Sequence, residues 1–277
     1  MLPENAGVLS NPGRTGVPFD SAHSKIRNQG VEELGECLPA INKFGISIMV
    51  HQGSSLPEKV ESSRERLKRI ASNDPSTVYV AWTGGKDSSV VLWLWRSVLR
   101  ELFPDNPPLP QALRVTTGLE FSEIERFCRR LIQEWGIAET RVGADTGNVP
   151  QDPGEDAVTC CRKLKIEPLR GAVSANGVQV LLTGLRQDEH PGRSERSVYE
   201  TRQDPHYEQV NPILEWTEMD IWSFVLSESM PYCSLYEQGY RSLDCYPCTA
   251  RSEMAERGGR NPDKEQQMEV LRSMGYF

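Results

Sequence analysis

The feature that most constrains this chain is a turn, Thr-Gly-Gly-Lys-Asp-Ser at residues 83–88, between two apolar segments of different pattern. Before the turn, residues 77–82 (TVYVAW) form a short run of β-branched and aromatic side chains, which is typical of a buried strand. After it, residues 88–102 carry a broad apolar face at helical spacing. A Gly-Gly turn before a helix N-terminus lets backbone N–H groups approach a phosphate, whose charge the helix dipole favours. The sequence therefore predicts a phosphate-binding loop.

The polar residues of this loop have separate expected roles. Lys86 supplies a mobile cation for phosphate oxygens, and Asp87 is a candidate to take part in Mg²⁺ binding. The predicted nucleotide-binding residues of the loop are Thr83, Gly84, Gly85, Lys86, Asp87, Ser88 and Ser89. The pattern differs from the P-loop, whose glycines have a longer spacer between them. The alternative is a tight turn with a capped helix, but such a turn needs neither the lysine nor the acid.

Strand-like and helix-like segments alternate along the chain. Strands are predicted at 45–50, 77–82, 112–117 and 178–185, and helices at 57–72, 88–102, 123–136, 161–174 and 219–229. The helix at 161–174 is expected to be broken or turned near Pro168. Alternation of this kind is typical of a mostly parallel sheet with helices on both faces. We therefore predict a doubly wound α/β fold with its ligand at the carboxyl ends of the strands.

Three regions are expected along the chain. Residues 1–55 are predicted to be a partly irregular N-terminal extension, because their first part is rich in Gly, Pro, Asn and Ser and has no periodicity. Residues 56–230 are expected to form the α/β domain. Residues 231–277 form a C-terminal segment with a Cys-x-x-Cys motif and a tail that is expected to cover the substrate.

Composition and charge narrow the functional classes. The formal net charge of −8 argues against a broad surface that tracks nucleic-acid phosphates, although it leaves room for a local basic patch. No apolar run approaches the roughly 20 residues of a membrane helix. The first residues lack the basic start and apolar stretch of a secretory signal. A cytoplasmic location without a membrane partner is therefore expected.

Four of the seven cysteines form two pairs, Cys160-Cys161 and Cys245-x-x-Cys248. Pairs far apart in a reducing compartment suggest metal or redox chemistry more than disulfides, and two pairs can converge on one Zn²⁺ or one [4Fe–4S] cluster. Adjacent ligands such as Cys160 and Cys161 are awkward for zinc, whose paired ligands usually have a spacer. The alternative is a set of unrelated buried thiols.

These motifs carry a family resemblance. The loop at 83–88 resembles the pyrophosphate-binding loop of N-type ATP pyrophosphatases, the adenine nucleotide alpha hydrolase superfamily. From about residue 77 onward, four segments resemble successive blocks of the phosphoadenosine-phosphosulfate reductase family within it: CCRKLKIEPL, GLRQDEHPGR, NPILEWTEMDIW and LYEQGYRSLDCYPCT. The resemblance implies a [4Fe–4S] cluster on Cys160, Cys161, Cys245 and Cys248. It also makes Arg186 and Arg193 candidate catalytic anion ligands beside Lys86 and Asp87, and Gly184 a candidate nucleotide-binding residue.

Two departures from the reductase pattern favour ATP as the substrate. The reductases resembled here end in a tail with a nucleophilic cysteine, whereas this sequence has no cysteine after Cys248. Reductases also tend to degrade the loop, because their substrate carries no pyrophosphate, whereas residues 83–88 keep it intact. In addition, ERGGRNPDKEQQMEVLRSMGYF at 256–277 resembles the small catalytic subunit of ATP sulfurylase.

The leading hypothesis is an ATP pyrophosphatase that cleaves ATP to AMP and pyrophosphate with Mg²⁺, activates an oxyanion and uses the cluster in sulfur incorporation. An intact loop with a cluster resembles the ATP-pyrophosphatase component of DNA phosphorothioation systems, which implies DNA and a cysteine desulfurase as partners. The basic residues available for DNA are Arg162, Lys163, Lys165, Arg170 and Arg186. The alternatives are a sulfonucleotide reductase, a sulfate adenylyltransferase small-subunit-like enzyme, and a non-catalytic Fe–S scaffold that binds nucleotide.

Overall fold

A six-stranded sheet forms the centre of the computed structural model, which describes residues 54–143 and 156–276. The strands are β1 (Val78–Ala81), β2 (Gln111–Thr116), β3 (Ala138–Gly143), β4 (Val180–Leu182), β5 (Tyr199–Gln203) and β6 (His206–Val210). Their order across the sheet is β3-β2-β1-β4-β6-β5. All neighbouring pairs are parallel except β5 and β6, which form an antiparallel hairpin at one edge.

The strand order reverses direction at β1. The chain moves from β1 to β2 on one side of the sheet and later returns to place β4 on the other side, so that Val80 pairs with both Ala112 and Leu182. All four residues of β1 are buried, as expected for a central strand covered on both faces. In such sheets ligands bind beyond the carboxyl ends of the strands where the order reverses. The loop at residues 83–88 lies at this position.

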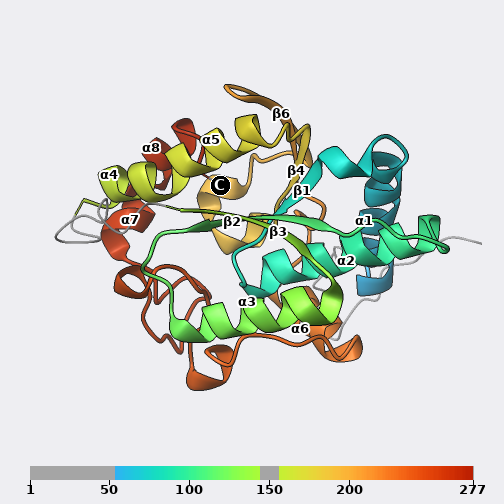
Figure 1. Cartoon of the computed structure of the whole chain (residues 1–277). Helices are drawn as coiled ribbons and strands as arrows, with labels where there is room; N and C mark the ends of the chain where they lie inside the picture. The colour runs from blue at the N-terminus through green and yellow to red at the C-terminus, as the bar shows by residue number, and fades with distance from the viewer. Residues whose placement is uncertain (1–53, 144–155, 277) are drawn as a thin grey trace, which may run out of the picture. The chain divides into compact units, whose positions relative to one another are not determined.

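Helices cover both faces of the sheet (Figure 1). The helices on one face share a core with β1 and are α1 (Leu56–Ala71), α2 (Lys86–Leu102), α3 (Ser122–Trp135) and α6 (Glu218–Ser227). On the other face, α5 (Glu167–Ala175) packs against Tyr79, Leu113 and Leu181. Three short helices complete the described chain: α4 (Ala157–Cys161), α7 (Pro262–Gln266) and α8 (Met268–Ser273). The predicted doubly wound α/β fold is confirmed.

Most predicted elements are present within a few residues of their expected bounds, but three strands were not predicted. No residue of β3 is buried, and the hairpin strands β5 and β6 are rich in charged and polar residues, so none of the three shows a buried apolar run. The strand predicted at 45–50 and nearly all of the extension predicted at 1–55 lie outside the described residues. In the part of the chain that the structure describes, no helix has the length and apolar character needed to cross a membrane.

The helix at 161–174, expected to be broken or turned near Pro168, is not broken, but its turns change in width just before Pro168. The helix continues from α4 through a wider π-helical turn, Arg162–Ile166, into α5. In this turn the N–H of Glu167 bonds to the carbonyl of Arg162, five residues back. Pro168 has no N–H to donate and its ring crowds the preceding turn, which the wider turn accommodates. The π turn begins directly after Cys161, and such turns are frequent at functional sites.

Candidate functional site

The backbone of the predicted phosphate loop has the conformation that its glycines allow. Gly84 has φ of 78°, and a Cβ there would lie 2.7 Å from Sγ of Cys128 on α3. Gly85 is the N-cap of α2, so Lys86 is the first residue of that helix. The loop therefore places a 17-residue helix with its N-terminus at the carboxyl end of β1, which is the arrangement that binds phosphate groups.

Gly184 fixes the distance between β4 and this loop. A Cβ on Gly184 would lie 2.7 Å from the backbone N of Ser88 and 2.8 Å from the carbonyl carbon of Asp87. The chain after β4 therefore runs directly against the first turn of α2, with no room for a side chain. Gly184 thus sets the position of the loop, and its nucleotide-binding role stays a prediction.

Lys86 is buried and already engaged with two carboxylates. Its Nζ pairs with Glu256, lies 3.2 Å from Oδ2 of Asp87, and donates to the carbonyl of Arg241 at 3.4 Å. Burial lowers the pKa of Lys86, but attraction to Asp87 and then to Tyr236 and Glu256 outweighs this, so the pKa lies above its ordinary value. Lys86 therefore carries a fixed positive charge at the N-terminus of α2.

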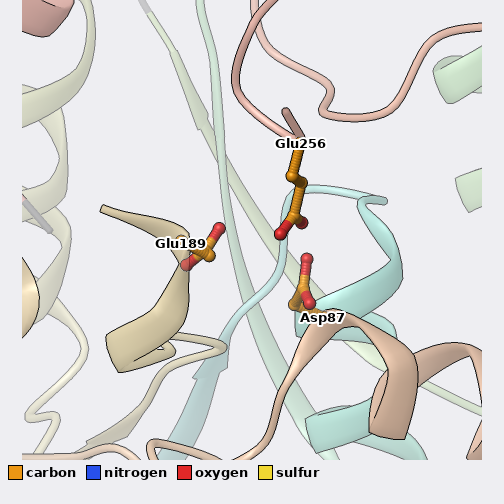
Figure 2. A group of neighbouring side chains, drawn as sticks. All are labelled: Asp87, Glu189 and Glu256. Carbon is orange, nitrogen blue, oxygen red and sulfur yellow. The ribbon is translucent and has the colours of Figure 1, made fainter. Parts of the chain in front are cut away.

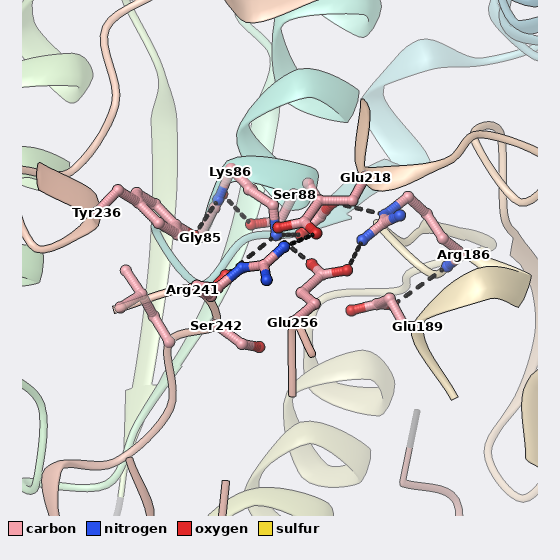
Figure 3. Close-up of polar contacts among 12 residues, drawn as sticks. Gly85, Lys86, Ser88, Arg186, Glu189, Glu218, Tyr236, Arg241, Ser242 and Glu256 are labelled. Atoms are coloured by element: carbon pink, nitrogen blue, oxygen red, sulfur yellow. Dashed lines mark hydrogen bonds and ion pairs between the residues drawn. The ribbon is translucent and has the colours of Figure 1, made fainter. Parts of the chain in front are cut away.

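Arg186 lies beside Lys86 and is fully buried. Its Nε donates to Oδ1 of Asp87 at 2.7 Å, its Nη2 to Oε2 of Glu256 at 2.5 Å, and its Nη1 to Asp188. Burial lowers the pKa of Arg186, and the attraction of Asp87 and then Glu256 raises it above the ordinary value. Figure 3 shows Lys86 and Arg186 converging on the carboxylate of Glu256. The structure thus brings together two of the predicted catalytic cations.

Three carboxylates gather at the same place (Figure 2). Asp87, Glu189 and Glu256 each offer an oxygen, and these oxygens lie within 4.8 Å of one another. Asp87 is the residue predicted to take part in Mg²⁺ binding, and oxygen ligands of this kind suit that ion. Asp87 and Glu256 also hold Lys86 and Arg186, and Glu189 pairs with Arg193, so the group serves as an ion-pair network in the structure described.

The hydroxyl groups of the loop divide into two sets. Thr83 and Ser88 line the main cavity, and their Oγ atoms lie 3.2 Å apart. Ser89 is buried, and its Oγ accepts a hydrogen bond from the indole N–H of Trp82 at 3.1 Å. Ser89 therefore stabilises the core beneath the loop, whereas Thr83 and Ser88 are placed to meet a ligand.

The main cavity extends from this loop toward the C-terminal segment and has a volume of about 220 Å³. Its wall carries several basic side chains: Arg114, Lys165, Arg193, Arg257 and Arg260. The predicted anion ligand Arg193 is buried and pairs with Glu189. Burial lowers the pKa of Arg193 more than the attraction of Glu189 raises it. Arg193 therefore faces the cavity with its charge largely balanced by Glu189.

The four predicted cluster ligands come together in a second, smaller cavity. Cys160 and Cys161 end α4, while Cys245 precedes and Cys248 ends a short turn at Tyr246–Cys248. All four line this cavity together with Leu119 and Leu164. Two cysteine pairs more than 80 residues apart in the sequence thus converge on one place.

The spacing of these thiols fits a cluster better than a single zinc ion. Tetrahedral zinc with four thiolates places the sulfur atoms about 3.8 Å apart. Among the described residues, the group of three possible ligand atoms within 4.8 Å of one another is the carboxylate trio, and no cysteine belongs to such a group. A wider set of four thiols around one cavity leaves the larger [4Fe–4S] group as the candidate for this cavity.

The two cavities share a wall. Thr117, Lys165 and Cys245 line both of them, and Oγ1 of Thr117 lies 3.2 Å from Sγ of Cys245. Lys165, one of the residues predicted to meet DNA, is paired with Asp244, whose side chain is 8% exposed. Asp244 also holds Lys264 and Arg260, and although burial raises its pKa, these cations bring it well below the ordinary value. Positive charge thus surrounds the wall between the thiols and the main cavity.

Comparison with known proteins places the chain among enzymes of sulfur metabolism. Residues 77–251, more than half of the chain, match the phosphoadenosine phosphosulfate reductase domain. The chain belongs to the phosphoadenosine phosphosulfate reductase family. This confirms the family resemblance carried by the loop and the cysteine motifs.

Relatives of this chain include proteins named as reductases and a protein named as a sulfate adenylyltransferase subunit. It is 30% identical to the adenosine 5'-phosphosulfate reductase of Allochromatium vinosum, over 76% of this chain and 85% of the relative. It is 27% identical to the sulfate adenylyltransferase subunit 2 of Rhodospirillum rubrum, over 83% of this chain and 100% of the relative.

Solved structures agree with the fold of this family. The phosphoadenylyl-sulfate reductase of Candida auris has a TM-score of 0.57 and 17% identity, covering 72% of this chain and 98% of that one. Yeast FAD synthetase in complex with FAD has a TM-score of 0.59 and 17% identity, covering 74% of this chain and 71% of that one. At these identities the likeness concerns the fold alone.

Among the site residues that were not singled out from the sequence are Glu189, Tyr236 and Glu256. Tyr236 accepts a hydrogen bond from the backbone N–H of Lys86 at 2.9 Å, and the two glutamates complete the carboxylate trio. An isolated Glu or Tyr carries no signal, because such residues are common on surfaces. Each of the three lies in a segment that carries the family resemblance, which was the available signal.

Proposed function

We propose that this chain is an enzyme of sulfur metabolism that binds an adenine nucleotide in the main cavity, with an anionic group of the nucleotide at Lys86 and Arg186. One observation carries the proposal. Two buried cations converge at the N-terminus of α2, in contact with Asp87, which lines the same cavity as Cys245 of the cysteine quartet. Fixed donors and cations in a buried site are the usual means of stabilising charge on a transferring phosphoryl or sulfuryl group.

Sulfonucleotide chemistry is the candidate that the relatives support better than ATP cleavage. Several of them are named adenosine 5'-phosphosulfate reductase, and one is named phosphoadenosine 5'-phosphosulfate reductase. Reducing adenylyl sulfate to sulfite and AMP requires two electrons, which two thiols supply by forming a disulfide. The shared wall at Cys245 suits a sulfonucleotide substrate, because the sulfuryl group of a bound sulfonucleotide would lie between the nucleotide loop and the quartet.

Such a reduction needs a nucleophilic thiol beyond the four of the quartet. Cys128 and Cys233 are buried, and burial raises the pKa of Cys128 to about 12. A protonated thiol of this kind is a poor nucleophile at neutral pH. Cys37, which lies outside the described residues, is the remaining cysteine of the sequence. In the reductase proposal Cys37 is therefore the thiol to test.

ATP cleavage between the α- and β-phosphates is the second candidate, and the loop itself favours it. The glycines, Lys86 and the acids around Asp87 form a site for a polyphosphate with Mg²⁺. A relative named sulfate adenylyltransferase subunit 2 spans most of the chain. The activated oxyanion would be sulfate, or a DNA phosphate in phosphorothioation with a cysteine desulfurase as sulfur donor. Arg162 and Lys163 are exposed beside the quartet and could meet DNA, whereas Arg186 is buried.

The [4Fe–4S] cluster is part of this proposal because the four thiols fit it. Cys160, Cys161, Cys245 and Cys248 would hold it, and when bound it would supply a redox-active group whose potential depends on nearby charge and hydrogen bonds. Thr117 and Lys165 are placed to provide these, through the Thr117–Cys245 contact and the positive charge of the shared wall.

The deciding experiment compares two reactions of anaerobically purified protein. One assay follows sulfite and AMP formed from adenylyl sulfate with a thiol reductant, and the other follows pyrophosphate released from ATP–Mg²⁺ alone, with sulfate, and with DNA. Lys86→Ala should lower the active reaction by about 100-fold or more, because it removes a buried charge from the phosphate site. Cys37→Ser should abolish sulfite formation while leaving ATP cleavage intact. Nucleotide binding without turnover in either assay would instead indicate a scaffold.

A further inference from the structure

A closed loop of the C-terminal segment reaches into the phosphate site. The two ends of the loop, residues 249–260, lie next to each other. Thr249 pairs with Arg260 in an isolated β-bridge, and the N–H of Ala250 donates to the carbonyl of Gly259 at 2.7 Å. A Cβ on Gly259 would lie 2.0 Å from the backbone oxygen of Ala250, so only glycine fits at this position. Met254 on the outside of the loop is 82% exposed. The loop therefore has one free side and one side turned to the site.

Glu256 is the residue that this loop places in the site. Its side chain is 8% exposed, and its carboxylate lies between Nζ of Lys86 and Nη2 of Arg186 (Figure 3). Tyr236, from the same C-terminal segment, accepts the backbone N–H of Lys86 at 2.9 Å. These donors are the ones that an anion at the N-terminus of α2 would use. A carboxylate and a phenol of the chain itself thus satisfy them.

The charges around the loop leave no surplus for a polyphosphate. Lys86 and Arg186 are two cations, and they contact three carboxylates, those of Asp87, Asp188 and Glu256. A pyrophosphate group entering this arrangement would meet a net negative site. Asp87 and Asp188 belong to segments fixed beside the loop, whereas Glu256 is carried on residues 249–260. Glu256 is therefore the carboxylate whose withdrawal would expose both cations.

We infer that Glu256 occupies the position of a nucleotide phosphate and competes with it, so that binding displaces Glu256 and with it the loop 249–260. This inference rests on the phosphate site of the proposed function and adds a specificity device to it. The next residue, Arg257, lines the main cavity and pairs with Glu189 and Glu265. Displacement of Glu256 would therefore also reposition a cation of the cavity wall. A ligand without enough negative charge would fail to displace the carboxylate.

The test measures pyrophosphate binding by calorimetry to the full chain in the presence of EDTA, so that no divalent cation takes part. Glu256→Gln removes the competing charge while keeping a side chain of the same shape, and it should bind pyrophosphate about tenfold more tightly than the unaltered protein. Glu253→Gln is the matched control, because Glu253 is exposed on the same loop and the charge change is identical. This control should bind like the unaltered protein.

Equal or weaker binding by Glu256→Gln would overturn the inference, as would an equal gain in Glu253→Gln, which would indicate a general effect of net charge. A second series of pyrophosphate titrations, with Mg²⁺ present, distinguishes displacement of Glu256 from a role of Glu256 as a metal ligand. In that role Glu256→Gln would bind Mg²⁺–pyrophosphate more weakly, whereas displacement predicts tighter binding there too. Lys86→Ala separates this inference from the proposed function. If pyrophosphate binding does not depend on Lys86, the phosphate site itself is misplaced, whereas Lys86-dependent binding with no gain in Glu256→Gln overturns the competition alone.

Discussion

At the scale of single residues, Gly184 allows β4 to lie close to the first turn of α2 because it has no side chain. Gly184→Ala should push the first turn of α2 away from β4, because its Cβ would lie within 2.8 Å of the backbone of Asp87 and Ser88. Backbone atoms cannot move aside as a flexible side chain can. We expect at least a tenfold loss of nucleotide affinity and a stability loss of about 1–3 kcal/mol from overpacking, measured by calorimetry and by denaturant unfolding.

The control for this substitution is Gly171→Ala. Gly171 lies within α5, and a Cβ there meets nothing within 4 Å. Alanine at a helical position of this kind should leave affinity unchanged and stabilise the helix by about 0.5–1 kcal/mol. Unchanged nucleotide affinity in Gly184→Ala would show that the loop tolerates a wider separation from β4 than the structure describes.

Residues of the site differ in how far the sequence could predict them. Lys86 and Asp87 were predictable, because their roles follow from local chain geometry between a strand and a helix. Glu256 was not, because it reaches Lys86 only through a tertiary approach across 170 residues of sequence. Ser89 was predicted to face the ligand and instead bonds to Trp82, since its hydroxyl lies on the core side of α2.

At the scale of elements, the quartet unites α4 with the turn at 246–248, and this pairing can be tested directly. Replacing any one of Cys160, Cys161, Cys245 or Cys248 by serine should lower the iron content of anaerobically purified protein and remove its visible absorbance, since each thiolate holds one iron. Cys128→Ser and Cys233→Ser should retain iron, because these buried thiols lie outside that cavity. Iron retained by all four quartet variants would contradict the assignment.

A second prediction concerns the junction of α6 with α1. Asp220 closes the capping box of α6 by accepting from the backbone N–H and the hydroxyl of Thr217, both at 2.8 Å, and it accepts from Nζ of Lys59 at 2.6 Å. Asp220→Asn should reduce the free energy of unfolding by about 1–2 kcal/mol at neutral pH. Denaturant unfolding at a series of pH values measures this difference.

The pH dependence of that difference follows from the pKa of Asp220. Burial raises this pKa, but the bonds from Lys59 and Thr217 lower it below its ordinary value of 3.8. A carboxylate with a lowered pKa contributes its full stability above that ordinary value and loses it as the pH falls further. The gap between the unaltered protein and Asp220→Asn should therefore be constant above about pH 4.5 and shrink below pH 3.8. A gap that persists at lower pH would mean that the carboxylate's charge is unimportant.

Elements were predictable where local pattern and burial agree. The segment 77–82 is a continuous apolar run and the segment 88–102 has helical periodicity, and both elements are present. β5 and β6 carry mostly polar side chains, and they are strands because each pairs with a neighbour rather than because of their own pattern. The π turn before Pro168 likewise depends on how a helix absorbs a missing N–H, which helical periodicity does not encode.

At the scale of the whole molecule, charge is distributed unevenly. The chain has a net charge of −8, yet basic residues outnumber acidic ones on the wall of the main cavity, five to four. This distribution suits a small anionic nucleotide, which is attracted locally, better than a long polyanion, which meets the acidic surface as well. In the phosphorothioation proposal, DNA would therefore depend on a partner protein to bring it to the site.

The strand order also has a consequence for how the molecule matures after synthesis. Asp87 and Arg186 are 99 residues apart in sequence and meet only after β4 has joined β1, and Glu256 arrives later still in chain order. Contacts of such separation form slowly, because long stretches of chain must first be closed. Nucleotide binding should therefore recover after helical content during refolding. Recovery of binding would then indicate that β4 has paired with β1.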